Sequence, residues 1–356
     1  MVTAIGAEEH SLEVLQEEHA LALLSDWSAQ SLESLPSAAR EVARKCGYLP
    51  LAVSLSGAVV RDGVPWLDVS EALDAAELDF LDHPHGSVMK SLKVSVDALR
   101  ASQAERYLEL AAFPKREGCS EQAVLTLWNH TGQLDARAGR KMLIALKSKA
   151  LLRIDGEGKQ RRVSLHDLQY DYLCASWGGL VGLHLEVIEA YQKKCPRGWA
   201  SGPKDGYFFR RVPWHLREAE KFDELHQLLL TFEWLQAKLE GTDIYSLISD
   251  YDYLPQEADL RTVQSVLRQS AHILAGNPRE LPGQLIGGVP ENFTPSGGVL
   301  RRQASEQKGF PWLRPLKPSL IPPNASLVRT LQGHTGSVMW GFFPSPMLRS
   351  VRRYCW

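Results

Sequence analysis

The sequence predicts a mainly α-helical protein with one small β-hairpin, and three observations lead to this fold class. Apolar residues recur at helical spacing over most of the first 275 residues. Two short β-prone runs flank the turn-prone stretch from Asp155 to Gly158, and together they predict a single hairpin. Prolines and glycines become frequent beyond residue 276, where we expect the helices to give way to a linker.

Residues 8–80 are predicted to form a bundle of short helices. Leu12 to Asp26 carries apolar residues at helical spacing with glutamates between them. Ala38 to Lys45 is rich in helix-forming residues and is followed by Gly47, a residue suited to end a helix. Pro50 then opens a third helix, because proline fits the first turn, where its missing N–H is not needed. Such helices, joined by tight turns, make a compact bundle.

Residues 86–176 are predicted to form a winged-helix domain, in which several helices are followed by one hairpin. The hairpin joins Leu151–Ile154 to Arg161–Leu165 and forms the wing. The helices expected before it are Ser87–Leu99, Gln103–Ala112, Glu121–His130 and Ala138–Lys149.

Residues 180–275 are predicted to form a helical arm, and residues 276–325 a Pro/Gly-rich linker without regular structure. We interpret the aromatic residues of the arm as core packing between stacked helices rather than as a ligand site. These aromatics are Tyr191, Tyr207, Phe208, Phe209, Trp214, Phe222, Phe232 and Trp234.

The composition is that of an ordinary soluble globular protein. Of the 356 residues 44% are hydrophobic and 23% charged, and the formal net charge of -2 excludes a protein that is basic all over. The five cysteines are widely separated, so no metal site is predicted from them. Neither a secretory signal nor a run of about 18 apolar residues occurs. We therefore expect a cytoplasmic protein with no membrane association.

No pattern that would support catalysis is present in the sequence. The phosphate-binding motif GxxxxGK[ST] does not occur, nor does a nucleophile elbow or a paired-carboxylate motif. We therefore expect no enzyme activity and no catalytic residues, and we interpret the chain as a regulatory or scaffold fragment. Histidines at positions 83, 85, 166 and 184 would be the starting points of a hydrolase, the interpretation that the sequence favours least.

Two short clusters stand out by their local chemistry. Cys46 to Ala52 reads as a helix end followed at once by a helix that starts with Pro50, which places a rigid ring at a tight corner. Leu165 to Leu168 stands at the start of a helix, where anions bind and where His166 could donate a hydrogen bond to a phosphate. The alternative is that Asp167 caps the helix and His166 only packs.

In their order these clusters resemble the NB-ARC (STAND) family of signalling ATPases. The stretch from Gly47 to Ala52 is similar to the GxP-type motif of the family, and Tyr107 to Pro114 to its winged-helix entry. Leu151-Leu152 is similar to the segment before the wing, and Leu165 to Leu168 to the MHD motif. The arm resembles that of the apoptotic members of the family. Residues 326–356 resemble the start of a truncated WD-repeat blade, because Gly333-His334 matches a blade opening.

This resemblance implies roles for two residues and for the chain as a whole. In the family the motif proline packs against adenine and the motif histidine contacts the β-phosphate of ADP, roles that fall here on Pro50 and His166. Because no phosphate-binding loop accompanies them, we expect no cofactor for this chain alone and ADP or ATP only together with an upstream nucleotide-binding half. Other proteins are the expected partners, with self-association through the NB-ARC-type module.

A nucleic-acid-binding winged helix is the alternative that the sequence leaves open. In DNA-binding winged helices the helix before the wing enters the major groove. Basic residues crowd this helix and the wing, although apolar residues of the same helix are needed for the core. The candidate nucleic-acid face consists of Arg137, Arg140, Lys141, Lys147, Lys149, Arg161 and Arg162.

Overall fold

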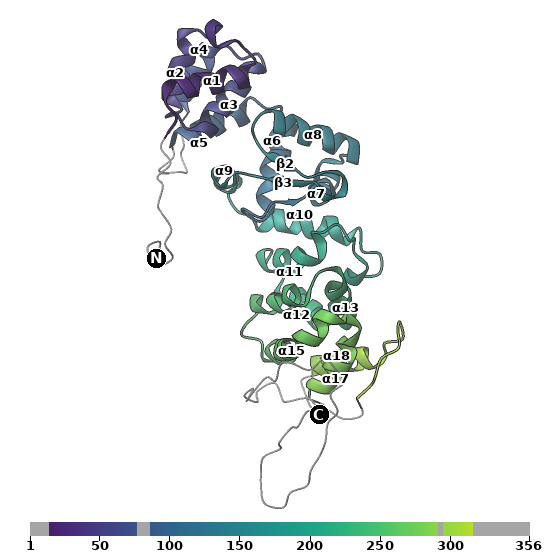
Figure 1. The fold of residues 1–356 in the computed structure, drawn as a ribbon. Coiled ribbons are helices and arrows are strands. Elements are labelled where there is room, and N and C mark those ends of the chain that lie inside the picture. Colours follow the sequence, from purple (N-terminus) through teal and green to yellow (C-terminus); the bar gives the residue numbers. More distant parts are fainter. Residues whose placement is uncertain (1–13, 77–85, 291–294, 316–356) are drawn as a thin grey trace, which may run out of the picture.

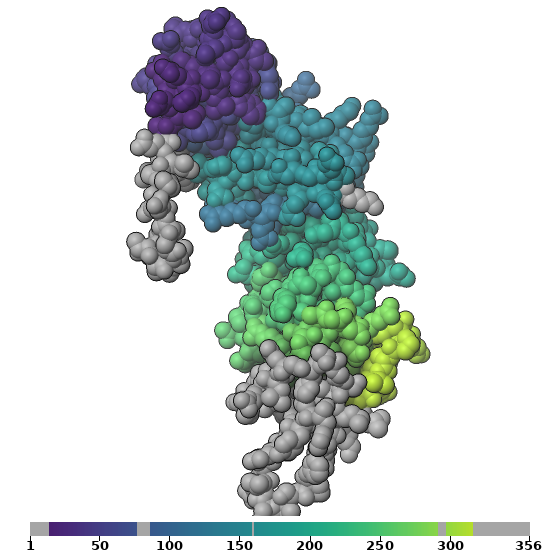
Figure 2. Space-filling view, in the orientation of Figure 1, coloured from purple at the N-terminus to yellow at the C-terminus, as the bar shows by residue number. Residues whose placement is uncertain are grey.

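The computed structural model describes residues 14–76, 86–290 and 295–315. The helical units follow one another in an elongated arrangement, with the N-terminal bundle at one end and the arm at the other (Figure 1). Figure 2 shows the bundle as a lobe at one end of this body. The predicted fold class, mainly α with one small β element, is confirmed. Within the described ranges, no helix has the length and apolarity needed to cross a membrane.

The N-terminal bundle consists of the short helices of residues 14–76 and of one further helix that packs against them. Its elements are α1 (Glu17–Ser28), the 3-10 turn η2 (Leu32–Ser34), α2 (Ser37–Lys45), α3 (Pro50–Arg61), α4 (Trp66–Ala75) and α5 (Gly86–Asp97). Helix α3 buries residues around most of its circumference, so it needs neighbours on more than one side. Helices α1 and α5 both pack against it. The structure thus places α5 with the bundle rather than with the domain predicted for residues 86–176, although α5 also contacts α9.

The winged-helix domain surrounds a three-stranded antiparallel sheet. Its elements are α6 (Ala101–Leu108), η3 (Glu109–Ala112), β1 (Cys119–Ser120), α7 (Glu121–Gly132), α8 (Ala136–Ser148), β2 (Arg153–Asp155), η4 (Gly158–Gln160), β3 (Arg162–Ser164) and α9 (Asp167–Trp177). The predicted hairpin is confirmed, with Ile154 opposite Val163. Strand β1 was not predicted from the sequence; it pairs with the other edge of β3 and gives the order β1-β3-β2.

The arm is a stack of short helices around an aromatic core. Its elements are α10 (Val181–Gln192), η5 (Trp199–Ser201), α11 (Phe208–Glu218), α12 (Phe222–Leu229), α13 (Phe232–Gly241), α14 (Ile244–Asp250), η6 (Tyr251–Tyr253), α15 (Ala258–Gln269) and α16 (Ala271–Gly276). Trp234, Tyr191 and Phe208 are fully buried, which confirms the core interpretation for them. Phe222 departs from it, because 48% of its surface is exposed.

The buried polar side chains of this arm include two close pairs. Lys238 and Asp250 form a buried ion pair of 2.6 Å, and the Lys238 ammonium also donates to the carbonyl oxygen of Phe209. Burial raises the pKa of Asp250 to about 7 and lowers that of Lys238. The second pair consists of two buried histidines, His184 and His215, whose Nδ1 atoms lie 2.8 Å apart. Both pairs depend on the surrounding helices to exclude water.

The prediction of an irregular linker is wrong for residues 278–288 and 295–305, which the structure describes as helical. These ranges contain η7 (Pro278–Glu280), α17 (Leu281–Gly288) and α18 (Pro295–Ser305), and α17 and α18 pack on α15 and α13 of the arm. The prolines stand in the first turns of these elements, where a missing N–H costs nothing. Gly288 permits close packing, because a Cβ there would lie 2.6 Å from a methyl group of Val266. Residues 326–356, and with them the predicted WD-repeat start, lie outside the described residues.

Candidate functional site

Pro50 is held at a sharp corner between α2 and α3. Gly47 and Tyr48 both have positive φ angles, of 60° and 55°, which reverse the chain just after α2. The N–H of Tyr48 donates to the carbonyl of Ala43, so the last turn of α2 closes on itself. Pro50 then occupies the first turn of α3, as predicted, and its ring is exposed at the surface.

His166 is the N-cap of α9. Its Nδ1 accepts a hydrogen bond of 3.2 Å from the N–H of Leu168, and its own N–H donates to the side chain of Gln169. The expectation that Asp167 caps the helix is therefore wrong; Asp167 lies in the first turn and pairs with Arg116 at 2.9 Å. Because Nδ1 accepts, the neutral imidazole carries its proton on Nε2. His166 thus presents an N–H donor on an exposed ring.

Pro50 and His166 line one cleft, which lies between the bundle and the winged-helix domain and has a volume of about 1030 Å³. The bundle side is mainly apolar and the winged-helix side is mainly charged. The apolar side chains are Leu23, Trp27, Leu49, Pro50, Leu51 and Val88. The charged side chains are Lys115, Arg116, Lys147, Arg153, Asp155, Asp167 and Asp171. A ligand that is apolar at one end and anionic at the other matches this division.

The charges of the cleft are only partly compensated. Lys115 forms an ion pair with Asp171, and Arg116 forms one with Asp167. Lys147 and Arg153 make no ion pair with any residue that the structure describes, and both are exposed. Together with the Nε2–H of His166 and the N-terminus of α9, they make this wall suited to an anion.

Long polar side chains close the joint beside the cleft. Arg61 at the end of α3 donates to the carbonyl of Ser148, and Lys149 pairs with Asp62. The Arg61 guanidinium also lies over the ring of Trp27, with 5.9 Å between its carbon and the ring centre. These contacts position Trp27 and the end of α8 at the edges of the cleft.

The structure divides the seven residues of the candidate nucleic-acid face among several roles. Arg140 and Arg161 both pair with the buried Glu121, at 2.7 and 3.0 Å. Arg162 donates to the carbonyls of residues 117 and 118, and Lys149 pairs with residue 62. Lys147 lines the cleft, which leaves Arg137 and Lys141 exposed on α8. Carboxylates thus pair with three of the seven, Arg140, Arg161 and Lys149.

The histidines considered for hydrolysis have other contacts. His184 is buried against His215, and burial lowers its pKa to about 4. His166 caps α9, and the histidines at positions 83 and 85 lie outside the described residues. These contacts explain His184 and His166 without any hydrolytic role.

The structure has a winged helix between a helical bundle and a helical arm, and Pro50 and His166 line one cleft. This arrangement is expected for the C-terminal portion of an NB-ARC (STAND) signalling protein. The comparisons with known proteins confirm this resemblance. Residues 180–282 match the family described as the APAF-1 helical domain. This range covers the whole of the predicted arm and extends into α17.

The similar proteins include animal and plant signalling proteins. Apoptotic protease-activating factor 1 of Homo sapiens is 26% identical over 278 residues, which are 74% of this chain and 22% of that protein. Its counterpart from Danio rerio is 26% identical over 245 residues, 67% of this chain and 19% of the relative. A probable disease resistance protein of Arabidopsis thaliana is 28% identical over 191 residues, 51% of this chain and 22% of the relative. The chain thus spans about a fifth of the length of these relatives.

Proposed function

We propose that this chain is a non-catalytic regulatory and scaffold part of an NB-ARC signalling protein, and that its cleft forms one wall of an ADP/ATP site. The observation that carries the proposal is the meeting of Pro50 and His166, which are far apart in the sequence, on one cleft. The residues present fit a nucleotide, because an apolar wall faces a wall with an N–H donor and with Lys147 and Arg153, which make no ion pair with any described residue.

Each wall has a distinct part in this proposal. Pro50 and the apolar side chains of the bundle pack against the base. The Nε2–H of His166 donates to a phosphate oxygen, and Lys147 and Arg153 attract the negative charge. A phosphate loop supplied by an upstream half completes the site, so this chain alone holds nucleotide weakly. The bound nucleotide would keep the bundle and the winged-helix domain together.

Release of that contact is the proposed switch, and other proteins are the proposed partners. The relatives are named for apoptosis and for disease resistance. We place the present chain in a comparable cytoplasmic pathway, where it makes protein contacts and self-associates through the NB-ARC-type module.

The proposal is tested by nucleotide binding with and without the upstream half. Titration of ADP into this chain, followed by calorimetry, should show no micromolar affinity. A chimera in which the phosphate-loop half of the human relative precedes this chain should retain ADP through gel filtration. His166→Ser keeps a helix-capping hydroxyl and removes the N–H donor, so it should weaken ADP retention at least about tenfold.

Lys141→Ala is the matched control, because Lys141 is exposed on α8 and does not line the cleft. It should leave ADP retention unchanged. Micromolar ADP binding by this chain alone, or equal retention by the His166→Ser chimera and its parent, would contradict the proposal.

Nucleic-acid binding remains the alternative, since Arg137 and Lys141 are exposed on the helix before the wing. Because carboxylates pair with Arg140, Arg161 and Lys149, we expect no salt-dependent shift of duplex DNA in a gel assay. A shift that weakens with salt, and whose salt slope falls by about one on Lys141→Ala, would favour the alternative.

A further inference from the structure

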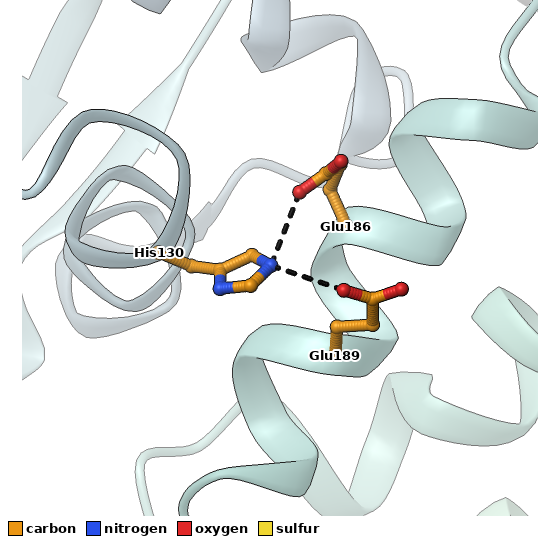
Figure 3. Close-up of side chains that lie close together, drawn as sticks. All are labelled: His130, Glu186 and Glu189. Atoms are coloured by element: carbon orange, nitrogen blue, oxygen red, sulfur yellow. Dashed lines mark ion pairs between the residues drawn. The ribbon is translucent and has the colours of Figure 1, made fainter.

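Three side chains with metal-ligand atoms converge where the winged-helix domain meets the arm. His130 lies in the last turn of α7, and Glu186 and Glu189 lie on α10. The Nε2 atom of His130 is 3.1 Å from a carboxylate oxygen of Glu186 and 3.4 Å from one of Glu189. Figure 3 shows the imidazole pointing between the two carboxylates, which reach toward it from the facing helix. The three ligand atoms all lie within 4.8 Å of one another.

We propose that His130, Glu186 and Glu189 bind one divalent transition-metal ion of the zinc class. Zinc bonds to nitrogen and oxygen measure about 2.0–2.1 Å, so neighbouring ligand atoms of a tetrahedral site lie about 3.3 Å apart. The two distances from His130 fall on either side of this value. An imidazole nitrogen among the ligands favours zinc over magnesium or calcium, which prefer oxygen alone.

Helix packing brings the ligands together. Glu186 and Glu189 are three residues apart, which places both carboxylates on one face of α10. Helix α10 packs directly against α7, which carries His130. The His130 side chain is only 11% exposed, whereas those of Glu186 and Glu189 are 47% and 61% exposed. The site is therefore anchored on the histidine side and open to solvent on the other, where water can take the fourth position.

Lys193 competes with the metal for this histidine. Its ammonium group lies 2.8 Å from Nδ1 of His130 and can only donate there, so in this arrangement the imidazole proton sits on Nε2. A metal ion needs the lone pair of Nε2, and the proton must then move to Nδ1. The Lys193 ammonium must leave at the same time, which its exposed position allows. Metal binding thus exchanges a lysine contact for an ion that joins α7 to α10.

The test is a titration of the full chain with Zn²⁺, followed by calorimetry and thermal unfolding. We expect one ion per chain at this site and a rise of the melting temperature on binding. Replacing both carboxylates, Glu186→Gln with Glu189→Gln, should weaken binding at least about tenfold while keeping the side-chain volumes. Lys193→Met should tighten binding, because it removes the competing donor. A structural role of the cluster alone would not produce this opposite effect.

Two controls separate this site from other zinc ligands. His226→Gln disables the other group of metal-binding residues in the described ranges, His226, Glu257 and Asp259, and should leave the binding in place. Co²⁺ as a probe should give no thiolate charge-transfer band, because no cysteine belongs to the site. Three results would overturn the proposal. The parent chain could fail to bind zinc, the double glutamine variant could bind zinc as tightly as the parent, or Lys193→Met could bind it more weakly.

Discussion

The bundle meets the winged-helix domain beside an open cleft, whereas the arm meets that domain through packed helices. The first joint relies on long polar side chains, among them Arg61 and Lys149, together with the contact of α5 and α9. At the second joint α10 packs against α7 and η3 and buries Leu183 and Val187. Polar contacts near the surface contribute little to stability, whereas apolar burial contributes much. We therefore expect motion at the cleft joint and a lasting connection at the arm joint.

The largest expected effect of a substitution lies inside the arm. Asp250→Asn leaves the Lys238 ammonium buried without a counter-charge, which should lower the free energy of unfolding by about 3–5 kcal/mol. Urea unfolding of the full chain measures this loss. Asp97→Asn, which removes an exposed pair with Lys93, is the control and should change stability by less than about 0.5 kcal/mol. Equal losses would contradict the expectation that the buried pair of the arm contributes more to stability than an exposed pair on α5.

An acid-sensitive loss of stability should appear next to the arm joint. Burial lowers the pKa of His184 to about 4 and that of His215 well below its usual range, against about 6.5 in the unfolded chain. Between these values the unfolded state binds more protons at the two histidines, so their contribution to stability is complete above about pH 6.5 and falls as the pH drops toward 4. For His184 the loss at pH 5.5 is about 1.4 kcal/mol. Because the raised pKa of Asp250 acts in the opposite direction over this range, the loss is measured as the difference between the parent and a variant without the His184 ring, each unfolded thermally between pH 7.5 and 5.5.

His184→Asn is the variant that isolates this effect, because it removes one of the two titrating rings. Its melting temperature should be lower at pH 7.5 but should depend less on pH than that of the parent. An unchanged pH dependence would mean that other groups cause the acid sensitivity.

The smallest effect on stability, but the clearest effect on shape, should come from the cleft joint. Lys149→Met removes the pair with Asp62 and should change the free energy of unfolding by less than about 1 kcal/mol. Because this pair ties the bundle to the winged-helix domain, its loss should widen the cleft. Small-angle scattering should then show a larger radius of gyration. A large stability loss with unchanged dimensions would show that the joint is rigid.

Local sequence signals predicted the helices and the hairpin closely. They failed where the same residue types are typical both of linkers and of helix starts or close helix packing. Pro50 and Gly47 bounded α3 and α2 correctly, because helix starts and ends depend on neighbouring residues. Prolines and glycines beyond residue 276 suggested a linker, yet in α17 and α18 they start helices and allow close packing. Strand β1 has only two residues and depends on its pairing with β3, so it left no pattern of its own.

The candidate site was only partly predictable for a related reason. Pro50 and His166 came from motifs, and the structure places both on one cleft. Trp27 and Arg153 line the same cleft but carry no local signal, because only the packing of the bundle against the wing brings them there. His130 and Glu186 are likewise far apart in the sequence and meet only through the contact of α7 with α10.

The elongated arrangement of the bundle, the winged-helix domain and the arm has a mechanical consequence. Because the arm continues the winged-helix domain in one direction (Figure 1), a small rotation about the cleft moves the far end of the arm much further than the residues around His166. A rotation at the cleft would therefore use the elongated body as a lever with the cleft as its pivot. It would displace α18 much further than the side chains that line the cleft.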